Sequence, residues 1–528
     1  MSSRRVPKKP LPLRPADPGG QTKKEEPPPV LTRDLARNLE ILKQALAESS
    51  DVVFREFAVG SRYLPAAVVF VDGLVDKQML DRDLLEALML ELALVERAGA
   101  GCLEPEAAMA CLKQRAVTAG EVRESRDLED LITFILSGDT AFLVQGAGYA
   151  LVVNTRGWKM RGLEEPVNEP TIRGPKEGFS ETVRVNTALV RRLVRDPRLK
   201  IEGMRLGRRS RTDCAVAFIE GVVNPDLVAE VRRRLATIDI DFIMETGDIE
   251  QMLEDSVLSP FPQMQHTERP DKAAAALMEG RVAILVDGTP FALLAPATFS
   301  QFFQSPEDYY QRWELASFLR LLRVFASYVA TFTPAIYVAL VSYHPGLLPT
   351  PLALSIAASR EGMPLPIMLE ALAMEFFFEV FREAGTRLPR AVGQTVGIVG
   401  GLIIGQAAVM ARLVSPATVI VVALTAMASF VIPAYDMAIA FRLLRFPLLF
   451  AAGILGLFGV MLGFIIINIH MVALNTFGTV YLSTFVPYQP RAWKDLLIRG
   501  PARTLRHRPE MLHPQDEVRQ ASRKESGW

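Results

Sequence analysis

The sequence is poor in the residues on which metal, redox and nucleophilic sites depend. Among 528 residues it has three cysteines and five histidines. Cys102, Cys111 and Cys214 show neither the paired spacing of a zinc site nor the even count of a disulfide framework, which favours a reducing compartment. No serine–histidine–acid set is visible, and the glycine-rich RGPKEGF (173–179) lacks the Gly-Lys-Ser/Thr ending of a phosphate-binding loop, so we expect it to be a structured loop. We therefore expect no catalytic residue, no metal and no cofactor.

The chain also lacks an excess of either charge. Its 59 lysines and arginines balance 59 aspartates and glutamates, and we expect no nucleic-acid partner. Charge is dense before about Arg312 and after about Arg491, and it is sparse between these two positions. This segregation indicates a soluble part, a membrane part and a soluble tail.

The amino-terminal stretch lacks apolar bulk. Residues 1 to about 34 mix proline with charge and cannot bury enough surface to offset the entropy of ordering, so we expect a disordered tail. The stretch also lacks the apolar core and the cleavage site of a secretory signal. The first large domain is therefore expected to stay in the cytoplasm.

A mixed α/β pattern follows from about residue 35 to residue 305, where short apolar runs bounded by glycine alternate with helical patterns. AAVVFVDGLVD (66–76) resembles AVAFIEGVVN (215–224). GDTAFLVQGAGYALVV (138–153) aligns with GRVAILVDGTPFALLA (280–295), and each is interpreted as a strand, a two-residue turn and a strand. We predict two tandem α/β subdomains of one design, 35–155 and, with an arginine-rich linker, 156–305.

The repeated acid–glycine pairs have two interpretations. Asp72-Gly73 and Glu220-Gly221 would supply paired carboxylates to an active site, or they would simply turn the chain at a strand end. Acid–glycine turns are the ordinary way to leave a sheet, and we favour the turn.

Residues 306–475 predict an α-helical multi-pass membrane domain. Four stretches each hold about twenty apolar residues, enough to cross a bilayer. They are Leu321–Tyr343, about Ala391–Ala411, Pro416 to about Ala440 and Phe446 to about Ala473. Arg320 and Arg323 are expected to snorkel at the cytoplasmic end of the first span. Residues 476–528 are interpreted as a basic cytoplasmic tail.

An acidic helix is predicted between the first two spans. PLPIMLEALAMEFFFEVFREA (364–384) is mostly apolar but carries Glu370, Glu375, Glu379 and Glu383, of which the last three would stack on one side of a helix. Carboxylates are costly against lipid, so this helix lies at the interface or faces protein or water. With four spans both ends of the chain are cytoplasmic, which fits the basic tail, whereas a fifth crossing would move the tail outside. We favour four spans with an interfacial or re-entrant acidic helix.

The second span carries a stripe of glycines. VGQTVGIVGGLIIGQ (392–406) combines four-residue glycine spacing with two glutamines: Gly393, Gln394, Gly397, Gly401, Gly405 and Gln406. Small residues at this spacing let helix backbones approach closely, and packing alone accounts for most such stripes. The glutamines favour protein or water over lipid, so the same helix is a candidate for lining a pore. The two interpretations are compatible.

Several long stretches carry a family resemblance. They are RGPKEGF followed by N-x8-R, LGRRSRTDCAVAFIEGVVNP, SPEDYYQRWELASFLRLLRVFA, LPTPLALSIAASREGMPLPIMLEALAMEFFFEVFREAGTRLPRAVGQ and the glycine stripe. From about residue 35 to about residue 495 the sequence resembles the A-subunit family of bacterial spore germinant receptors, the GerA family. The proline-rich start and the arginine-rich tail fall outside the resemblance.

The resemblance implies a location, partners and an activity. It implies a multi-pass protein of the inner membrane of the endospore, with a large cytoplasmic domain, that acts with a transporter-like B-subunit and a lipoprotein C-subunit. It also implies a homo-oligomer, a ring of five, that acts as a ligand-gated monovalent cation channel and starts germination. In such a ring the stripe residues become the pore or gate candidates, and Glu375, Glu379 and Glu383 become candidates for acidic girdles that favour cations.

Less specific interpretations stand beside the channel. The three glutamates would instead pair with Arg382, Arg387 and Arg390. The whole protein would be a non-conducting scaffold that clusters the receptor complex. A transporter would prefer inverted repeats, which the membrane part does not show, so it ranks last.

Overall fold

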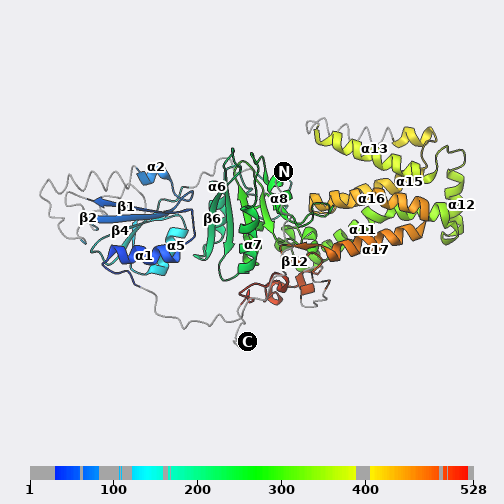
Figure 1. Cartoon of the computed structure of the whole chain (residues 1–528). Helices are drawn as coiled ribbons and strands as arrows, with labels where there is room; N and C mark the ends of the chain where they lie inside the picture. Colours follow the sequence, from blue (N-terminus) through cyan, green and yellow to red (C-terminus); the bar gives the residue numbers. More distant parts are fainter. Residues whose placement is uncertain are drawn as a thin grey trace, which may run out of the picture.

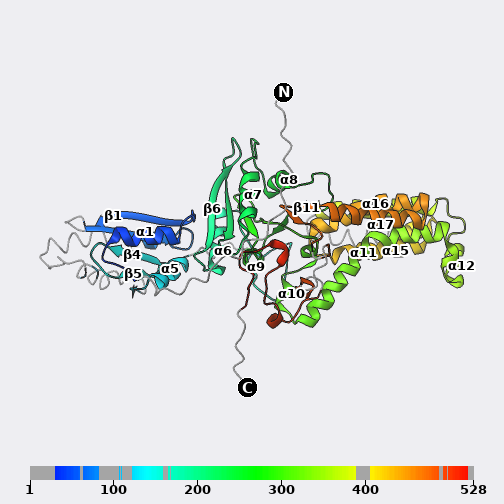
Figure 2. The ribbon, with the colours of Figure 1, turned by 60° about the horizontal axis from the view of Figure 1, so that its bottom comes forward.

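The computed structural model describes residues 30–59, 64–81, 106, 109, 122–157, 165–166, 168–387, 405–483, 485–486, 492–495 and 498–520. These residues form an elongated molecule (Figure 1). Two β-sheets lie side by side in its first half, and a bundle of long helices extends from the second sheet. The carboxy-terminal segment returns to the second sheet, as the turned view in Figure 2 also shows.

Two five-stranded antiparallel sheets form the first half. The strands of the first are β1 Val52–Val59, β2 Leu64–Val71, β3 Val122–Ser125, β4 Thr140–Val144 and β5 Ala150–Val153. The strands of the second are β6 Leu199–Leu206, β7 Thr212–Ile219, β8 Gln265–Thr267, β9 Val282–Val286 and β10 Ala292–Ala295. Their orders are β1-β2-β4-β5-β3 and β6-β7-β9-β10-β8, so every strand of the first sheet has a counterpart in the second. The repeated sequence segments occupy these equivalent strands.

Helices cover the sheets in matching positions. On the first sheet they are α1 Leu35–Ala45, α2 Lys77–Met79 and α5 Leu128–Leu136; on the second they are α6 Val183–Leu193, α7 Pro225–Leu235, α8 Thr246–Leu253 and α9 Pro270–Met278. Helices α1 and α5 share one buried core with the first sheet, and α6 and α9 share one with the second. Helices α7 and α8 cover the other face of the second sheet. Each fully buried leucine or valine in these cores contributes roughly 1.5–3 kcal/mol to folding.

The two-residue hairpin turns predicted from the sequence are wrong, whereas the interpretation of the acid–glycine pairs as turns is confirmed. The hairpin loops span residues 145–149 and 287–291 rather than two residues. The turn glycines Gly146 and Gly288 have φ of 91° and 89°, a conformation that glycine adopts readily and that suits a longer loop. Gly73 and Gly221 also have positive φ, 92° and 77°, so both acid–glycine pairs turn the chain.

The first sequence boundary also needs correction. Residues 1–29 lie outside the described residues, but residues 30–34 are ordered rather than part of a tail. Val30 forms a β-bridge with Asp127, and the Asp34 carboxylate caps α1 by accepting a hydrogen bond from Ala36 N at 3.1 Å. A capping aspartate satisfies a free N–H of the first helical turn, which is why the fold begins before residue 35.

The second half begins with short elements and continues as a helical bundle. The short elements are η3 Phe299–Phe303, α10 Glu307–Tyr310, η4 Pro345–Leu347, β11 Asn475–Thr476, β12 Thr479–Val480, η5 Ala492–Asp495, η6 Ala502–Thr504 and η7 Glu510–Leu512. The bundle helices are α11 Trp313–Tyr343, α12 Thr350–Ser359, α13 Ile367–Arg387, α15 Pro416–Phe430, α16 Tyr435–Leu455 and α17 Leu457–Ala473. Within the described residues, α11 and α16 are long and apolar enough to cross a membrane, and α12, α15 and α17 are shorter apolar helices.

The predicted third and fourth spans have the wrong boundaries. The break falls at Ile432 and Pro433 instead of near Arg442, because proline lacks the N–H that a continuing helix needs. Helix α16 then runs through Arg442 and Arg445, and it ends at Gly456, whose φ of 61° turns the chain into α17. Most of the predicted second span, residues 391–404, lies outside the described residues.

The acidic helix α13 lies along the bundle. Moving along α13 from its start to its end, the contacted residues on α15 have increasing sequence numbers. The contacted residues on α16 have decreasing sequence numbers. The α15 partners are Ser415, Thr425 and Ser429, and the α16 partners are Gly453, Arg445 and Arg442. Helix α13 therefore runs parallel to α15 and antiparallel to α16, with its first turn at the end of the bundle distant from the sheets.

Candidate functional site

The base of α11 is fixed by a buried charge cluster. Arg320 donates to Asp308 at 3.0 Å and Arg323 donates to the same carboxylate at 2.7 Å. Asp308 and Arg320 are each 1% exposed as side chains. Arg320 also donates to the Asp495 carbonyl oxygen at 2.6 Å. The two arginines therefore do not snorkel into water as predicted, because α10 supplies a carboxylate to bury against them.

A polar seam crosses the bundle where α13, α15 and α16 meet. Its centre is an ion pair between Glu375 and Arg445, whose side chains are each 3% exposed. Thr425 donates to the other Glu375 oxygen at 3.3 Å, and Arg445 donates to the Ala330 carbonyl at 2.8 Å. Ionised side chains occur in buried sites when they are paired with an opposite charge and make further hydrogen bonds, as Glu375 and Arg445 do here.

The seam continues toward both ends of α13. At the end distant from the sheets, the buried Glu370 pairs with Arg360 and accepts from the backbone N–H of Ser415. At the other end Glu379 accepts from Arg382 and from Arg442, each at 3.3 Å. Glu383 forms an exposed pair with Arg387 at 2.6 Å.

The three acidic-ring candidates therefore occupy different environments. Glu375 faces the interior of its own bundle, Glu379 is half exposed and Glu383 is exposed. Arg382 and Arg387 are partners, as the alternative interpretation proposed, whereas Arg390 lies outside the described residues. The pairing of Arg445 with Glu375 was missed, because a sequence-based span boundary placed Arg445 in a loop.

The glycine stripe is only partly visible. Gly393, Gln394, Gly397 and Gly401 lie outside the described residues. Residues 405–410 are helical, and a Cβ placed on Gly405 would lie 4.0 Å from Val419 Cγ1 of α15, while Gln406 is exposed. Both remain candidates for a pore or gate.

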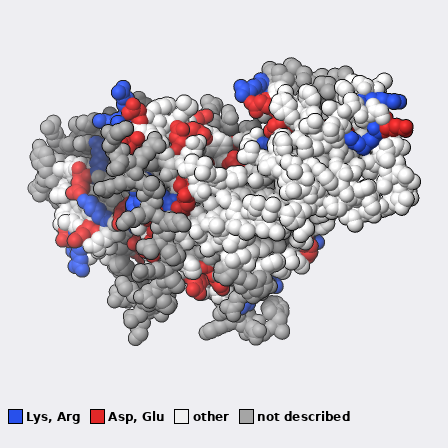
Figure 3. Space-filling model, turned by 45° about the vertical axis from the view of Figure 1, so that its right-hand side comes forward, with Lys and Arg blue, Asp and Glu red and all other residues white. Residues whose placement is uncertain are grey.

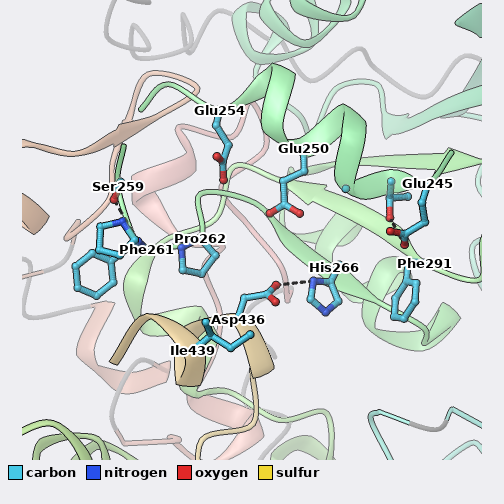
Figure 4. Close-up of a pocket in the computed structure, with 13 residues that line it drawn as sticks. Glu245, Glu250, Glu254, Ser259, Phe261, Pro262, His266, Phe291, Asp436 and Ile439 are labelled. Carbon is cyan, nitrogen blue, oxygen red and sulfur yellow. Dashed lines mark hydrogen bonds and ion pairs between the residues drawn. The ribbon is translucent and has the colours of Figure 1, made fainter. Parts of the chain in front are cut away.

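A cavity of about 450 Å³ lies where the second sheet meets the bundle (Figure 4). His266 of β8 donates from Nδ1 to Asp436 at the start of α16, at 2.8 Å. Glu250 and Glu254 of the α8 region point into the same space, and Phe291 stacks edge-on against His266. Ser259 hydrogen-bonds His470 of α17 at 2.9 Å, so both α16 and α17 are tied to the sheet domain here.

The cavity shifts the protonation of its carboxyl groups. Burial, with the charges of Asp436 and Glu254, raises the pKa of Glu250 to about 8. Burial chiefly raises the pKa of Glu254 to about 7. Burial lowers the pKa of His266, but the Asp436 carboxylate outweighs it and the net pKa is raised. The described residues contain no group of three His, Cys, Asp or Glu side chains that could hold a metal.

The outer surface of the bundle is apolar. Large side chains stand exposed along every long helix, among them Phe325 on α11, Phe450 on α16 and Phe458 on α17. On the face shown in Figure 3, charged side chains lie near the sheet domain and at the far end of the bundle, with an almost uncharged zone between. The arrangement places charge inside and apolar groups outside, which is the reverse of a water-soluble helical bundle.

Comparison with known proteins gives consistent matches. The family described as Bacillus/Clostridium GerA spore germination protein matches residues 40–511. "Spore germination protein KA" of Bacillus subtilis (strain 168) is 41% identical over 497 residues, covering 94% of this chain and 90% of the relative. "Spore germination protein GerLA" of Bacillus cereus is 42% identical over 489 residues, covering 92% and 97%. The crystal structure of the N-terminal domain of the A subunit of the Bacillus megaterium spore germinant receptor GerK3 is 36% identical, with a TM-score of 0.42, and the match covers 52% of this chain and 99% of that one.

Proposed function

This chain belongs to the GerA family of spore germination proteins, and from that premise we propose that it is a germinant-receptor A subunit that forms a gated channel for monovalent cations. The proposal places the bundle in the inner membrane of the endospore and the sheet domain on the cytoplasmic side. Its partners are a transporter-like B-subunit, a lipoprotein C-subunit and further copies of this chain in a ring.

One observation supports conduction over a purely passive role: the polar seam inside an apolar bundle. Ionised side chains are costly at membrane depth, and those that occur there commonly mark ion pathways or moving parts. Glu370, Glu375 and Glu379 follow one another along α13, and each is matched by an arginine. Arg442 and Arg445 lie about one turn apart on α16, so a shift of α13 along α16 would pass a glutamate from one arginine to the other.

The proposal separates the roles of the three acidic-ring candidates. Glu375 holds the bundle together through Arg445, whereas Glu379 and Glu383 remain accessible to a water-filled mouth between copies. Carboxylates at a pore mouth favour cations. The glycine stripe, with Gln394 and Gln406, supplies the proposed pore lining or gate.

Nutrient binding at the partner opens the channel by a population shift in this scheme. A ligand moves such an equilibrium only as far as its affinities for the two states differ. The sheet domain is joined to the bundle at the base of α11, at the His266–Asp436 pair and at the Ser259–His470 hydrogen bond, so these contacts are routes by which the domain and the helices bias each other.

Potassium efflux tests the proposal. Liposomes or cells containing this protein with its partner subunits are compared for wild type, Gly401→Ala and Gly401→Leu at equal membrane levels. Gly346→Ala is the matched control, because no atom lies within 4 Å of a Cβ added at Gly346. A leak or block at Gly401 with unchanged oligomer size supports the conduit.

Two other results would favour the non-conducting scaffold. If nutrient-stimulated efflux in the complete complex is the same for wild type, Gly401→Ala and Gly401→Leu, the stripe serves packing. If the wild-type complex never differs from empty membranes, channel activity is wrong and the protein clusters or relays within the receptor.

A further inference from the structure

The carboxy-terminal segment encloses a cavity against the second sheet. The cavity has a volume of about 540 Å³ and lies between the start of β9, the η3 turn, η5 and residues 503–511 with Arg519. Figure 2 shows the segment crossing beside α9. This cavity is separate from the polar seam and from the junction cavity beside His266, since it shares none of their residues.

Backbone contacts hold the segment in place. The Arg499 guanidinium donates to the Gln311 carbonyl at 2.7 Å, and the Arg499 carbonyl accepts from the Ser317 hydroxyl at 3.1 Å. Further along, Arg508 donates to the Met278 carbonyl at 2.8 Å, and Gln515 N donates to the Val222 carbonyl at 3.0 Å. The walls of the cavity are thus formed by the folded chain before any ligand binds.

The lining is rich in arginine. Five arginines face three carboxylates: Arg281, Arg503, Arg506, Arg508 and Arg519 against Glu279, Asp495 and Glu510. The carboxylates are partly engaged elsewhere, since Asp495 pairs with Arg320 at 3.2 Å. Arg508 pairs with Asp516 at 2.9 Å. Within the described part of the chain, Arg503, Arg506 and Arg519 form no ion pair with a protein carboxylate.

The deepest of these arginines has an unused donor. The Arg281 side chain is 5% exposed and pairs with Glu279 at 3.1 Å. Its Nε is buried without a hydrogen-bond partner among the described residues. Burial chiefly lowers the pKa of Arg281, which reflects the cost of holding a cation there. An anion in the cavity would offset the charge of Arg281 and the charges of the exposed rim arginines together.

We propose that this cavity binds a phosphate-bearing anion, with Arg281 at its floor and Arg503, Arg506 and Arg519 at its rim. The planar guanidinium fork matches phosphate oxygens in pairs, which favours phosphate over a simple halide. Two sources share this chemistry, a soluble phosphate compound and the headgroup of an anionic lipid. A lipid headgroup could reach the cavity from the apolar surface of the bundle. Arg499, in the same carboxy-terminal segment, contacts the first turns of α11, where Trp313 and Phe318 are exposed. The site does not depend on channel activity.

The test uses the full chain in nanodiscs and two probes. Inorganic pyrophosphate is titrated by calorimetry in nanodiscs of neutral phosphatidylcholine. In parallel, the thermal midpoint is followed as phosphatidylglycerol replaces phosphatidylcholine. The test variant is Arg503→Ala/Arg506→Ala/Arg519→Ala. The control is Arg205→Ala/Arg208→Ala/Arg209→Ala, which removes the same charge from three exposed arginines that already pair with aspartates.

A soluble ligand predicts that pyrophosphate binding weakens at least about tenfold in the rim variant and less than about twofold in the control, since one charge-assisted hydrogen bond is worth roughly a factor of ten in affinity. A lipid ligand predicts that phosphatidylglycerol raises the thermal midpoint of wild type and control but not of the rim variant. Arg281→Lys should reproduce either loss in part, because lysine keeps the charge but lacks the planar guanidinium fork. If neither probe distinguishes the rim variant from the control, the proposal is wrong.

Discussion

Removing the charge of Glu375 should destabilise the bundle far more than removing the charge of Glu383. Both residues lie on α13 and both pair with an arginine. The Glu375 and Arg445 side chains are each 3% exposed, whereas those of Glu383 and Arg387 are 63% and 79% exposed. Breaking a buried pair from one side costs roughly 3–5 kcal/mol, because the remaining charge is left without compensation. An exposed pair contributes about 0–1 kcal/mol.

The magnitude for Glu375→Gln should fall in the upper part of that range for a structural reason. Arg445 would keep its hydrogen bond to the Ala330 carbonyl at 2.8 Å but would have no other carboxylate partner among the contacts described. Thr425 would also lose its charged acceptor. The double substitution Glu375→Leu/Arg445→Met removes both charges and should recover most of the loss, since apolar replacements of a buried pair are often neutral or stabilising.

The assay is chemical unfolding of the full chain in mild detergent, followed by tryptophan fluorescence, for Glu375→Gln, Glu383→Gln and the double variant. The reasoning is refuted if Glu375→Gln and Glu383→Gln lower the free energy of unfolding equally. It is also refuted if the double variant is no more stable than Glu375→Gln alone, because the cost would then not arise from an orphaned charge.

Three other predictions concern the junctions. Glu250 has its pKa raised from an ordinary 4.5 to about 8, so its protonated form is favoured in the fold; stability should be greatest at low pH and decline as pH rises toward 8. The raised pKa of His266 acts in the same sense, because its ion pair with Asp436 is lost as pH rises through that raised pKa. Between pH 5.5 and 9 the free energy of unfolding should therefore decline less steeply in Glu250→Gln than in wild type. Gly456→Ala should cost about 1–3 kcal/mol, because φ is 61° and the new Cβ would lie 2.9 Å from the His344 ring; Gly346→Ala, measured by the same unfolding assay, should cost far less. Asp308→Asn should lower the thermal midpoint and expose the base of α11 to protease, and an unchanged cleavage rate would contradict the buried cluster.

The repeated sheet was accessible from the sequence because its signals are local. Apolar runs of five to eight residues, each closed by a glycine that needs positive φ, recur in the same order in both halves. The length of each hairpin loop was not accessible in the same way. Gly146 marks where the chain turns, but cross-strand pairing of Phe142 with Leu151 decides where the strands stop.

The charged seam was only half predictable. The spacing of Glu375, Glu379 and Glu383 identifies a helix with an acidic side, and Arg382 and Arg387 are within reach on the same helix. Arg445 lies 70 residues further along the chain, and its charge made the helix through it look like a boundary. Only the antiparallel packing of α13 on α16 shows that two unfavourable buried charges cancel each other.

The buried charge cluster of Asp308 with Arg320 and Arg323 allows α11 to transmit a movement of the sheet domain along the bundle. A helix of 31 residues extends about 46 Å at 1.5 Å per residue, and its first turns are clamped to the sheet domain. Arg320 and Arg323 lie 23 and 20 residues before the opposite end, so about 30–35 Å of helix extends beyond the clamp, and a rotation of the domain by about 5° would sweep that end through about 3 Å. That end meets the Gly456 turn through Tyr343 and His344. Helix α11 thus acts as a lever with its fulcrum at Arg320 and Arg323, and a small tilt of the domain becomes a displacement of side-chain size at the far side of the bundle.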